Sequence, residues 1–190
     1  MLTIIHGGQT GVDRGAHDAA IANGWSIAGY MPRDQRDELG QIPPDVARFL
    51  VAIDKTSYTA RTEANVRAAT AALFVVRDAD DPRTTPGTAK TIDLATDRRL
   101  RQRIADPRTD ARTIALWIWS DLLLMRTMLL PFDEKILDPV PTRLIVAGPR
   151  ESKWHGARVE TAALLRRVGT ALAEIVRPPE PGRDLPPERR

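Results

Sequence analysis

Short apolar segments, each followed by a loop, restrict the fold of this chain more than any other feature. The clearest are Leu2–Ile5, Ala71–Val76 and Leu144–Ala147, and each is followed by a loop and then by a helical pattern. Strands buried on both faces of a parallel sheet have such continuous apolar runs, and helices return the chain between them. The pattern therefore predicts an α/β protein with a Rossmann-like open parallel sheet and helices on both faces.

The remaining elements complete this alternation less clearly. Strands are expected at Ser26–Gly29 and Phe49–Ile53, and helices at Val12–Ala22, Tyr58–Thr70, from about Gly87, and at His155–Val176. Arg112–Arg126 fits an amphipathic helix in which a strand could hide. We predict one ligand-binding domain over residues 1–176, with 98–143 as a divergent insertion. Residues 177–190, rich in proline and charge, are predicted to be a disordered tail.

Composition narrows the chemistry that the chain can carry. With 42% hydrophobic and 28% charged residues among 190, it has the balance of a globular domain. It contains no cysteine, which excludes disulfides, thiolate metal ligands and cysteine nucleophiles. Three scattered histidines make a histidine metal site improbable, so no protein-held metal is expected.

Charge and hydropathy bear on location and partners. Met1–Ile5 runs directly into the first strand without a leader pattern, so a cytoplasmic protein is expected. The longest apolar stretch, Thr113–Leu130, contains Asp121 and Arg126, which argues against a membrane span. The net charge is +3, but the arginines gather on no evident face, so nucleic acid binding is unsupported.

A glycine-rich loop joins the first predicted strand to the first predicted helix. Such loops lie at the carboxyl edge of the sheet, where glycines let backbone amides approach an anion and the helix N-terminus adds positive charge. Its candidate ligand-binding residues are Gly7, Gly8, Gln9, Thr10, Gly11, Asp13 and Arg14, with Arg14 as a phosphate clamp. The loop matches neither G-x-G-x-x-G nor a Walker loop, so a turn that only packs strand against helix is the alternative.

Further candidates lie in segments expected at the same edge. They are Pro86, Gly87 and Thr88 before a helix, Gly148, Arg150, Glu151 and Ser152 after the last strand, Arg61 and Asn65 on one helix face, and Arg33 in a polar loop. Each has a structural alternative: a capped helix start, a surface salt bridge, a solvated helix with an ion pair between Glu63 and Arg67, or a plain connection.

These motifs together resemble the family of molybdenum cofactor carriers, within the Lonely-Guy-type Rossmann superfamily. The matching strings are GGQTGVDR at 7–14 and AGPRES at 147–152, and the resemblance covers Leu2 to about Ala95 and Arg143 to Leu172. It implies that molybdopterin or a nucleotide-derived ligand is bound through its phosphate and passed to a molybdoenzyme acceptor. The family usually has Gly-Gly-Thr where this chain has Pro86-Gly87-Thr88, so the cradle is expected to differ in shape.

Three functions remain open at this stage. A carrier needs an anion site without a general base. A phosphoribohydrolase of Lonely-Guy type would need a glutamate three residues after the Gly-Thr pair, where this chain has Thr91. A nucleotide-sensing module would bind without transfer. We expect a binding protein rather than an enzyme, and a homo-oligomer with Trp117 and Trp119 at the interface.

Overall fold

Five parallel strands form the central sheet of the computed structural model, which describes residues 2–128 and 142–177. Their order is β2-β1-β9-β7-β8, and all four neighbouring pairs are parallel. The strands are β1 (Leu2–Ile5), β2 (Ser26–Ala28), β7 (Ala71–Val75), β8 (Arg101–Ala105) and β9 (Thr142–Ala147).

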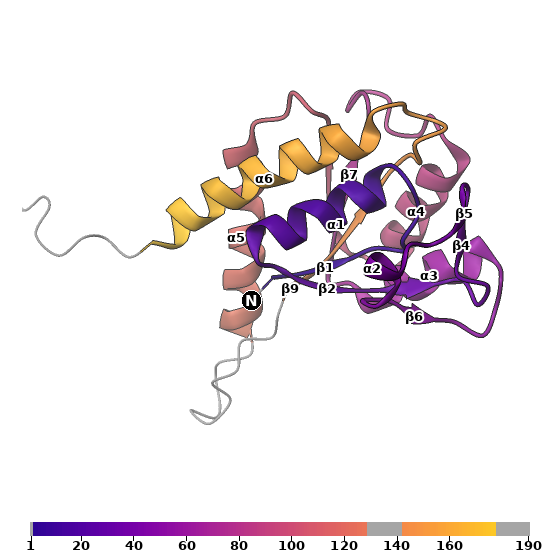
Figure 1. Cartoon of the computed structure of the whole chain (residues 1–190). Helices are drawn as coiled ribbons and strands as arrows, with labels where there is room; N and C mark the ends of the chain where they lie inside the picture. Colours follow the sequence, from indigo (N-terminus) through magenta and orange to yellow (C-terminus); the bar gives the residue numbers. More distant parts are fainter. Residues whose placement is uncertain (1, 129–141, 178–190) are drawn as a thin grey trace, which may run out of the picture.

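Helices cover both faces of this sheet, which confirms the predicted fold class (Figure 1). One face carries α1 (Val12–Asn23), α5 (Ala111–Met128) and α6 (Ala157–Val176), and the other carries α3 (Tyr58–Ala68) and α4 (Pro86–Asp97). Alternate side chains of β7 enter the two cores: Leu73 packs in the first and Phe74 in the second. Burial on both faces explains why β1, β7 and β9 could be predicted from apolar runs alone.

The last βα unit lies in the middle of the sheet. Strand β9 is inserted between β1 and β7, although it comes last along the chain. If β9 and α6 are counted first, the strand order becomes 3-2-1-4-5, the order of doubly wound nucleotide-binding sheets. Strand order then reverses between β9 and β7, and such a switch point leaves a crevice at the carboxyl ends of the strands.

Part of the expected insertion at 98–143 belongs to this sheet. It contains β8, the edge strand beside β7, and α5, which contacts α6. Arg112–Arg126, in which a strand could hide, lies wholly within the helix α5, and β8 lies before it. Residues 129–141, and the predicted disordered tail beyond Arg177, lie outside the described residues.

The segment between β2 and α3 forms a small flap of short elements. It contains β3 (Tyr30–Met31) paired with β6 (Val51–Ala52), the hairpin β4 (Arg36–Asp37) and β5 (Gly40–Gln41), and α2 (Pro44–Ala47). The strand expected at Phe49–Ile53 is only two residues long. Among the described residues, no helix is long and apolar enough to cross a membrane.

Candidate functional site

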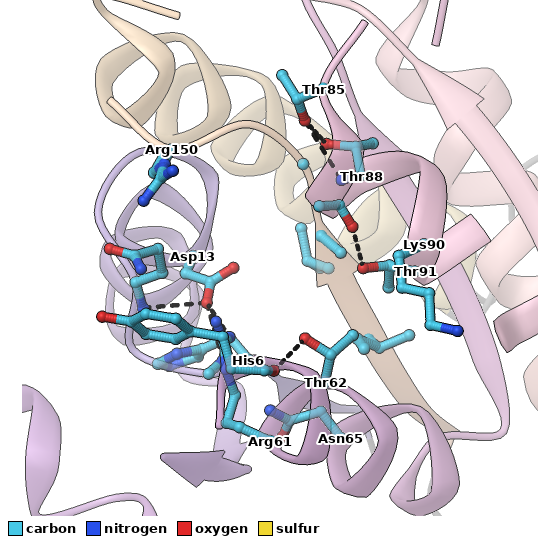
Figure 2. A pocket seen from close by; sticks show the side chains of 18 of the residues that line it. His6, Asp13, Arg61, Thr62, Asn65, Thr85, Thr88, Lys90, Thr91 and Arg150 are labelled. Carbon is cyan, nitrogen blue, oxygen red and sulfur yellow. Dashed lines mark hydrogen bonds and ion pairs between the residues drawn. The ribbon is translucent and has the colours of Figure 1, made fainter. Parts of the chain in front are cut away.

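A pocket of about 530 Å³ opens at the carboxyl ends of β1 and β9, next to the N-terminus of α4 and one side of α3 (Figure 2). The pocket borders the switch point between β9 and β7, because its lining includes residues that follow each of these two strands along the chain. Its lining residues are His6, Gly7, Gln9, Asp13, Tyr58, Thr59, Arg61, Thr62, Asn65, Thr85, Pro86, Gly87, Thr88, Lys90, Thr91, Ile145, Val146, Ala147, Gly148, Arg150 and Lys153.

The structure brings ten of the predicted site residues together in this pocket. These are Gly7, Gln9, Asp13, Arg61, Asn65, Pro86, Gly87, Thr88, Gly148 and Arg150. The other seven, Gly8, Thr10, Gly11, Arg14, Arg33, Glu151 and Ser152, do not line it. Segments far apart in the sequence therefore meet at one edge of the sheet. Ten of the candidate residues line the pocket there, and the other seven lie outside its lining.

The carboxylate of Asp13 fixes the glycine-rich loop and Arg61 at one side of the pocket. Its Oδ2 accepts hydrogen bonds from the backbone amides of Gly7, at 2.9 Å, and Gln9, at 3.1 Å, and lies 3.2 Å from Nη1 of Arg61. Burial raises the pKa of Asp13, while Arg61 and the two amides work to lower it. A Cβ on Gly7 would collide with the Arg61 guanidinium, so this glycine is what lets Arg61 lie against the loop.

Arg14 has a structural role instead of the predicted phosphate clamp. Its Nε donates to the carbonyl of Gly8 at 3.1 Å, and its Nη2 lies 2.7 Å from Oδ2 of Asp37. Both side chains of this ion pair are buried, with 8% and 3% of their surface exposed. The guanidinium is therefore occupied in tying α1 to the β4-β5 hairpin.

Other predicted residues are also engaged within the protein. Asn65 lines the pocket, but its amide accepts from the backbone N–H of Tyr30 at 2.7 Å and donates to the Tyr30 carbonyl at 3.0 Å. Glu151 accepts from the backbone amides of Gly156 and Arg158 and so caps α6. Arg33 is exposed and lies 3.5 Å from Asp54, away from the pocket lining.

The two glycine loops are packed backbone to backbone. Gly11 has φ +70°, and a Cβ there would lie 2.6 Å from the carbonyl oxygen of Pro149. The amide of Val12 donates to that same carbonyl at 3.2 Å. Thr10 and Ser152, one from each loop, both donate to the carboxylate of Glu38, a residue that we had not predicted. The motifs at 7–14 and 147–152 are thus packed against each other and share the partner Glu38.

Several pocket residues were missed in the sequence. Tyr58, Arg61, Thr62 and Asn65 lie at helical spacing on one side of α3, a pattern that would have added Tyr58 and Thr62 to the site. Lys90 and Thr91 follow the predicted Pro86-Gly87-Thr88 loop, and Lys153 follows the other loop. In Figure 2 the amine of Lys90 points away from the middle of the pocket, whereas Arg61 and Asp13 face each other.

His6 contributes a neutral ring to the pocket. Its Nδ1 accepts from the backbone amide of Gly8 at 3.1 Å, so its Nε2 carries the proton and lies 3.2 Å from Nδ1 of His17. Burial, with help from His17 and the nearby arginines, lowers the pKa of His6 to about 3. His6 therefore adds no positive charge near neutral pH, and the positive charge of the pocket comes from its arginines and lysines.

Among the described residues, no group of three or more histidine or acidic side chains is arranged to hold a metal ion. The tryptophan beside the candidate site, Trp154, is a core residue with 7% of its surface exposed. Trp117 and Trp119 are partly buried against the same core cluster.

Two comparisons with known proteins agree with this geometry. A model of the circularly permutated YpsA SLOG family matches residues 4–169. Among solved structures, the chain is similar to the crystal structure of a "Putative molybdenum carrier protein" from Syntrophus aciditrophicus SB, with 25% sequence identity and a TM-score of 0.67. That match covers 88% of this chain and 94% of the other. No curated protein matches. These findings confirm the resemblance inferred from the glycine motifs, and the described strand order agrees with a circular permutation.

Proposed function

The chain belongs to the circularly permutated YpsA SLOG family, and from this premise we propose that it is a carrier that binds a phosphate-bearing ring compound in the pocket and releases it unchanged. The ligand class is molybdopterin or a nucleotide derivative. The name of the similar Syntrophus protein supports the first of these. A molybdoenzyme acceptor, a cytoplasmic location and a homo-oligomer stay predictions.

The charge of the pocket is the observation that carries this proposal. Four basic residues line it, Arg61, Lys90, Arg150 and Lys153, and two carboxylates pair with them: outside the lining that of Glu38 with Arg150, and within it that of Asp13 with Arg61. That carboxylate is already held by Arg61 and two backbone amides. A partly enclosed site with excess positive charge attracts anions, and guanidinium groups bind phosphate with two parallel hydrogen bonds.

The shape of the pocket suits the rest of such a ligand. A volume of about 530 Å³ lies in the range of small-molecule sites. Tyr58 offers an aromatic ring at the lining, 44% exposed, on which a pterin or a base can stack. Thr59, Thr62 and Thr88 line the same space. The hydroxyls of Thr62 and Thr88 already bond the Tyr58 carbonyl and the Thr85 hydroxyl, but a hydroxyl oxygen can still accept from exocyclic amino groups.

A carrier is favoured over a hydrolase because Asp13 and Thr91, which line the pocket, already have hydrogen-bond partners within the protein. Oδ2 of Asp13 is held by Arg61 and two backbone amides, so this oxygen is a poor general base for activating water. Thr91 lines the pocket at the position where a phosphoribohydrolase would need its glutamate, and its Oγ1 donates to the carbonyl of Gly87 at 2.8 Å. The remaining acids near the motifs, Glu63 and Glu151, are not among the lining residues.

A binding experiment tests the proposal with two matched arginine variants. Arg150 lines the pocket with a side chain 42% exposed, whereas the exposed Arg33 lies outside it. Calorimetric titration with AMP and with molybdopterin is expected to show binding to the wild type. Arg150→Ala should weaken it by about tenfold or more, the scale of a charge-assisted hydrogen bond, and Arg33→Ala should leave it within about twofold.

The same titrations separate the alternatives. Release of free adenine from AMP would show a phosphoribohydrolase and end the carrier proposal. Equal losses in the two variants would place the ligand somewhere other than in this pocket. No binding of either compound by the wild type would remove the proposal altogether.

A further inference from the structure

Glu38 lies at the turn of the β4-β5 hairpin, and its carboxylate reaches across to both glycine loops. Its Oε1 accepts from the hydroxyl of Thr10 and from the backbone amide of Ser152, at 3.1 Å. Its Oε2 accepts from the Ser152 hydroxyl and lies 3.3 Å from Nε of Arg150. Only 10% of the side chain is exposed.

These donors are the kinds that proteins use to hold phosphate. A backbone amide, hydroxyls and a guanidinium are common partners of phosphate oxygens, and here all of them converge on one anion. The pKa of Glu38 reflects this: burial works to raise it, but the hydrogen bonds from Ser152 and Thr10 and the charge of Arg150 lower it overall. The residues that we had identified as anion ligands from the motifs Thr10-Gly11 and Arg150-Glu151-Ser152 do bind an anion, and it is supplied by the chain itself.

The hairpin does not depend on Glu38 alone for its position. Asp37 next to it forms the buried ion pair with Arg14, and the Glu38 amide donates to Oε1 of Gln9 at 3.1 Å. The carboxylate can therefore leave its donors by a rotation of one side chain while the hairpin stays anchored. The following residue, Leu39, is 84% exposed, so open space adjoins the turn.

Two residues connect this group of donors to the pocket. Arg150 lines the pocket and also bonds Glu38, and Gln9 lines the pocket beside Thr10. Lys153, directly after Ser152, is another lining residue. A ligand whose first phosphate lies in the pocket thus has a second set of anion donors at its border.

We propose that Thr10, Arg150 and Ser152 form a second anion subsite, which the Glu38 carboxylate fills until a ligand with two linked phosphates displaces it. The inference rests on the proposed function and extends it: a ligand with two linked phosphates, such as a nucleoside diphosphate or a dinucleotide, occupies both the pocket and the subsite, whereas a ligand with one phosphate binds in the pocket alone. A purely structural latch is the alternative, and it predicts that removing the Glu38 charge leaves the ratio of ADP affinity to AMP affinity unchanged or lowers it.

The test compares the affinities for ADP and AMP in wild type and in Glu38→Gln, using calorimetric titration. Loss of a carboxylate raises the attraction for both anions, but only ADP gains a place in the freed subsite, so the ratio of the two affinities isolates the proposal. That ratio is expected to rise about tenfold. Glu174→Gln removes the same charge in the last turns of α6, where Glu174 lies 4.0 Å from Arg112, and should leave the ratio unchanged.

Two further measurements keep the outcome decisive. Adding Ser152→Ala to Glu38→Gln should lower the ratio again by several-fold. In a crystal structure of the wild type with ADP, the β-phosphate should contact Ser152 and Glu38 should have turned outward. If AMP binds but the ratio stays constant or falls in Glu38→Gln, the subsite is wrong and the carrier proposal stands. If the wild type and the variant bind neither nucleotide, the subsite is wrong, and the carrier proposal is then decided by the titration with molybdopterin.

Discussion

His6, directly after β1, is a polar side chain that is buried and hydrogen-bonded in the protein interior. The ring is 1% exposed and forms hydrogen bonds on both sides, to Gly8 and His17. In a charged imidazolium Nδ1 would carry a proton and could not accept from the Gly8 amide, and the charge would lie near Arg14 and Arg61. The folded protein therefore excludes a proton that the unfolded chain accepts.

Stability should fall below neutral pH because of this residue. The folded pKa of about 3 lies below the ordinary value of 6.5, so the contribution of His6 is complete above pH 6.5 and is lost as the pH falls toward 3. Between pH 7 and pH 5 the loss is about 2 kcal/mol. Burial also lowers the pKa of His17, which acts in the same direction.

Urea unfolding at the two pH values checks this. His6→Asn keeps an oxygen that can accept from Gly8 and removes the titrating group, so its free energy of unfolding should fall by about 2 kcal/mol less than that of the wild type. Equal losses in wild type and variant would mean that His6 is protonated in the folded state.

Individual side chains also mark the limit of what the sequence could predict about the site. The glycines and Arg150 were found because their motifs fix them at the ends of strands. Arg14 was misassigned because its partner, Asp37, lies 23 positions away in a hairpin that no local pattern predicts. Glu38 was missed for the same reason, since its partners Thr10 and Ser152 lie far from it in the sequence, one before it and one after it.

At the scale of elements, the glycines at strand ends differ in what they do. A Cβ on Gly148 would collide with the carbonyl oxygen of Val75, which means that β9 must approach β7 closely at this point. A Cβ on Gly87, in the first turn of α4, would meet nothing within 4 Å. Both residues line the pocket.

This contrast predicts opposite effects on stability. Gly148→Ala should destabilise the protein by about 1 to 3 kcal/mol, because the added methyl group has no room. Gly87→Ala should be neutral or stabilise by up to about 1 kcal/mol, since alanine favours the helix. Chemical denaturation of the pair measures both, and a neutral Gly148→Ala would show that the junction of β9 and β7 is looser than described.

Strand β8 shows why part of the fold was less predictable than the rest. Its sequence, Arg-Gln-Arg-Ile-Ala, lacks the apolar run that reveals a central strand, because it forms the edge of the sheet and its side chains are partly exposed. Arg101 is held by Asp121 of α5 at 2.9 Å and lies over the ring of Trp117. Such contacts depend on tertiary structure, whereas β1, β7 and β9 are defined by their own composition.

For the whole molecule, the order of the strands carries the strongest prediction. A chain that begins at Thr142, runs through α6 and continues by a short linker into β1 would have the 3-2-1-4-5 order along its sequence. Since α6 runs antiparallel to the strands, its end and the start of β1 lie on the same side of the molecule (Figure 1). The linker therefore need not cross the sheet.

This rearranged chain is expected to fold and to retain the pocket. Its circular dichroism spectrum should match that of the parent, and its unfolding free energy should lie within about 2 kcal/mol, because all contacts between elements are kept and only the connection changes. A chain that unfolds or binds AMP much more weakly would show that the connection before β9 is essential.

The most direct test of the account is the fate of the bound ligand. Purified protein is incubated with molybdopterin, passed through gel filtration, and the compound that stays with the protein is identified by mass spectrometry. The account predicts intact molybdopterin in the protein fraction of wild type and Arg33→Ala, and little in that of Arg150→Ala. Recovery of a hydrolysed product, or equal retention by Arg150→Ala, would contradict a carrier whose cargo is held in this pocket.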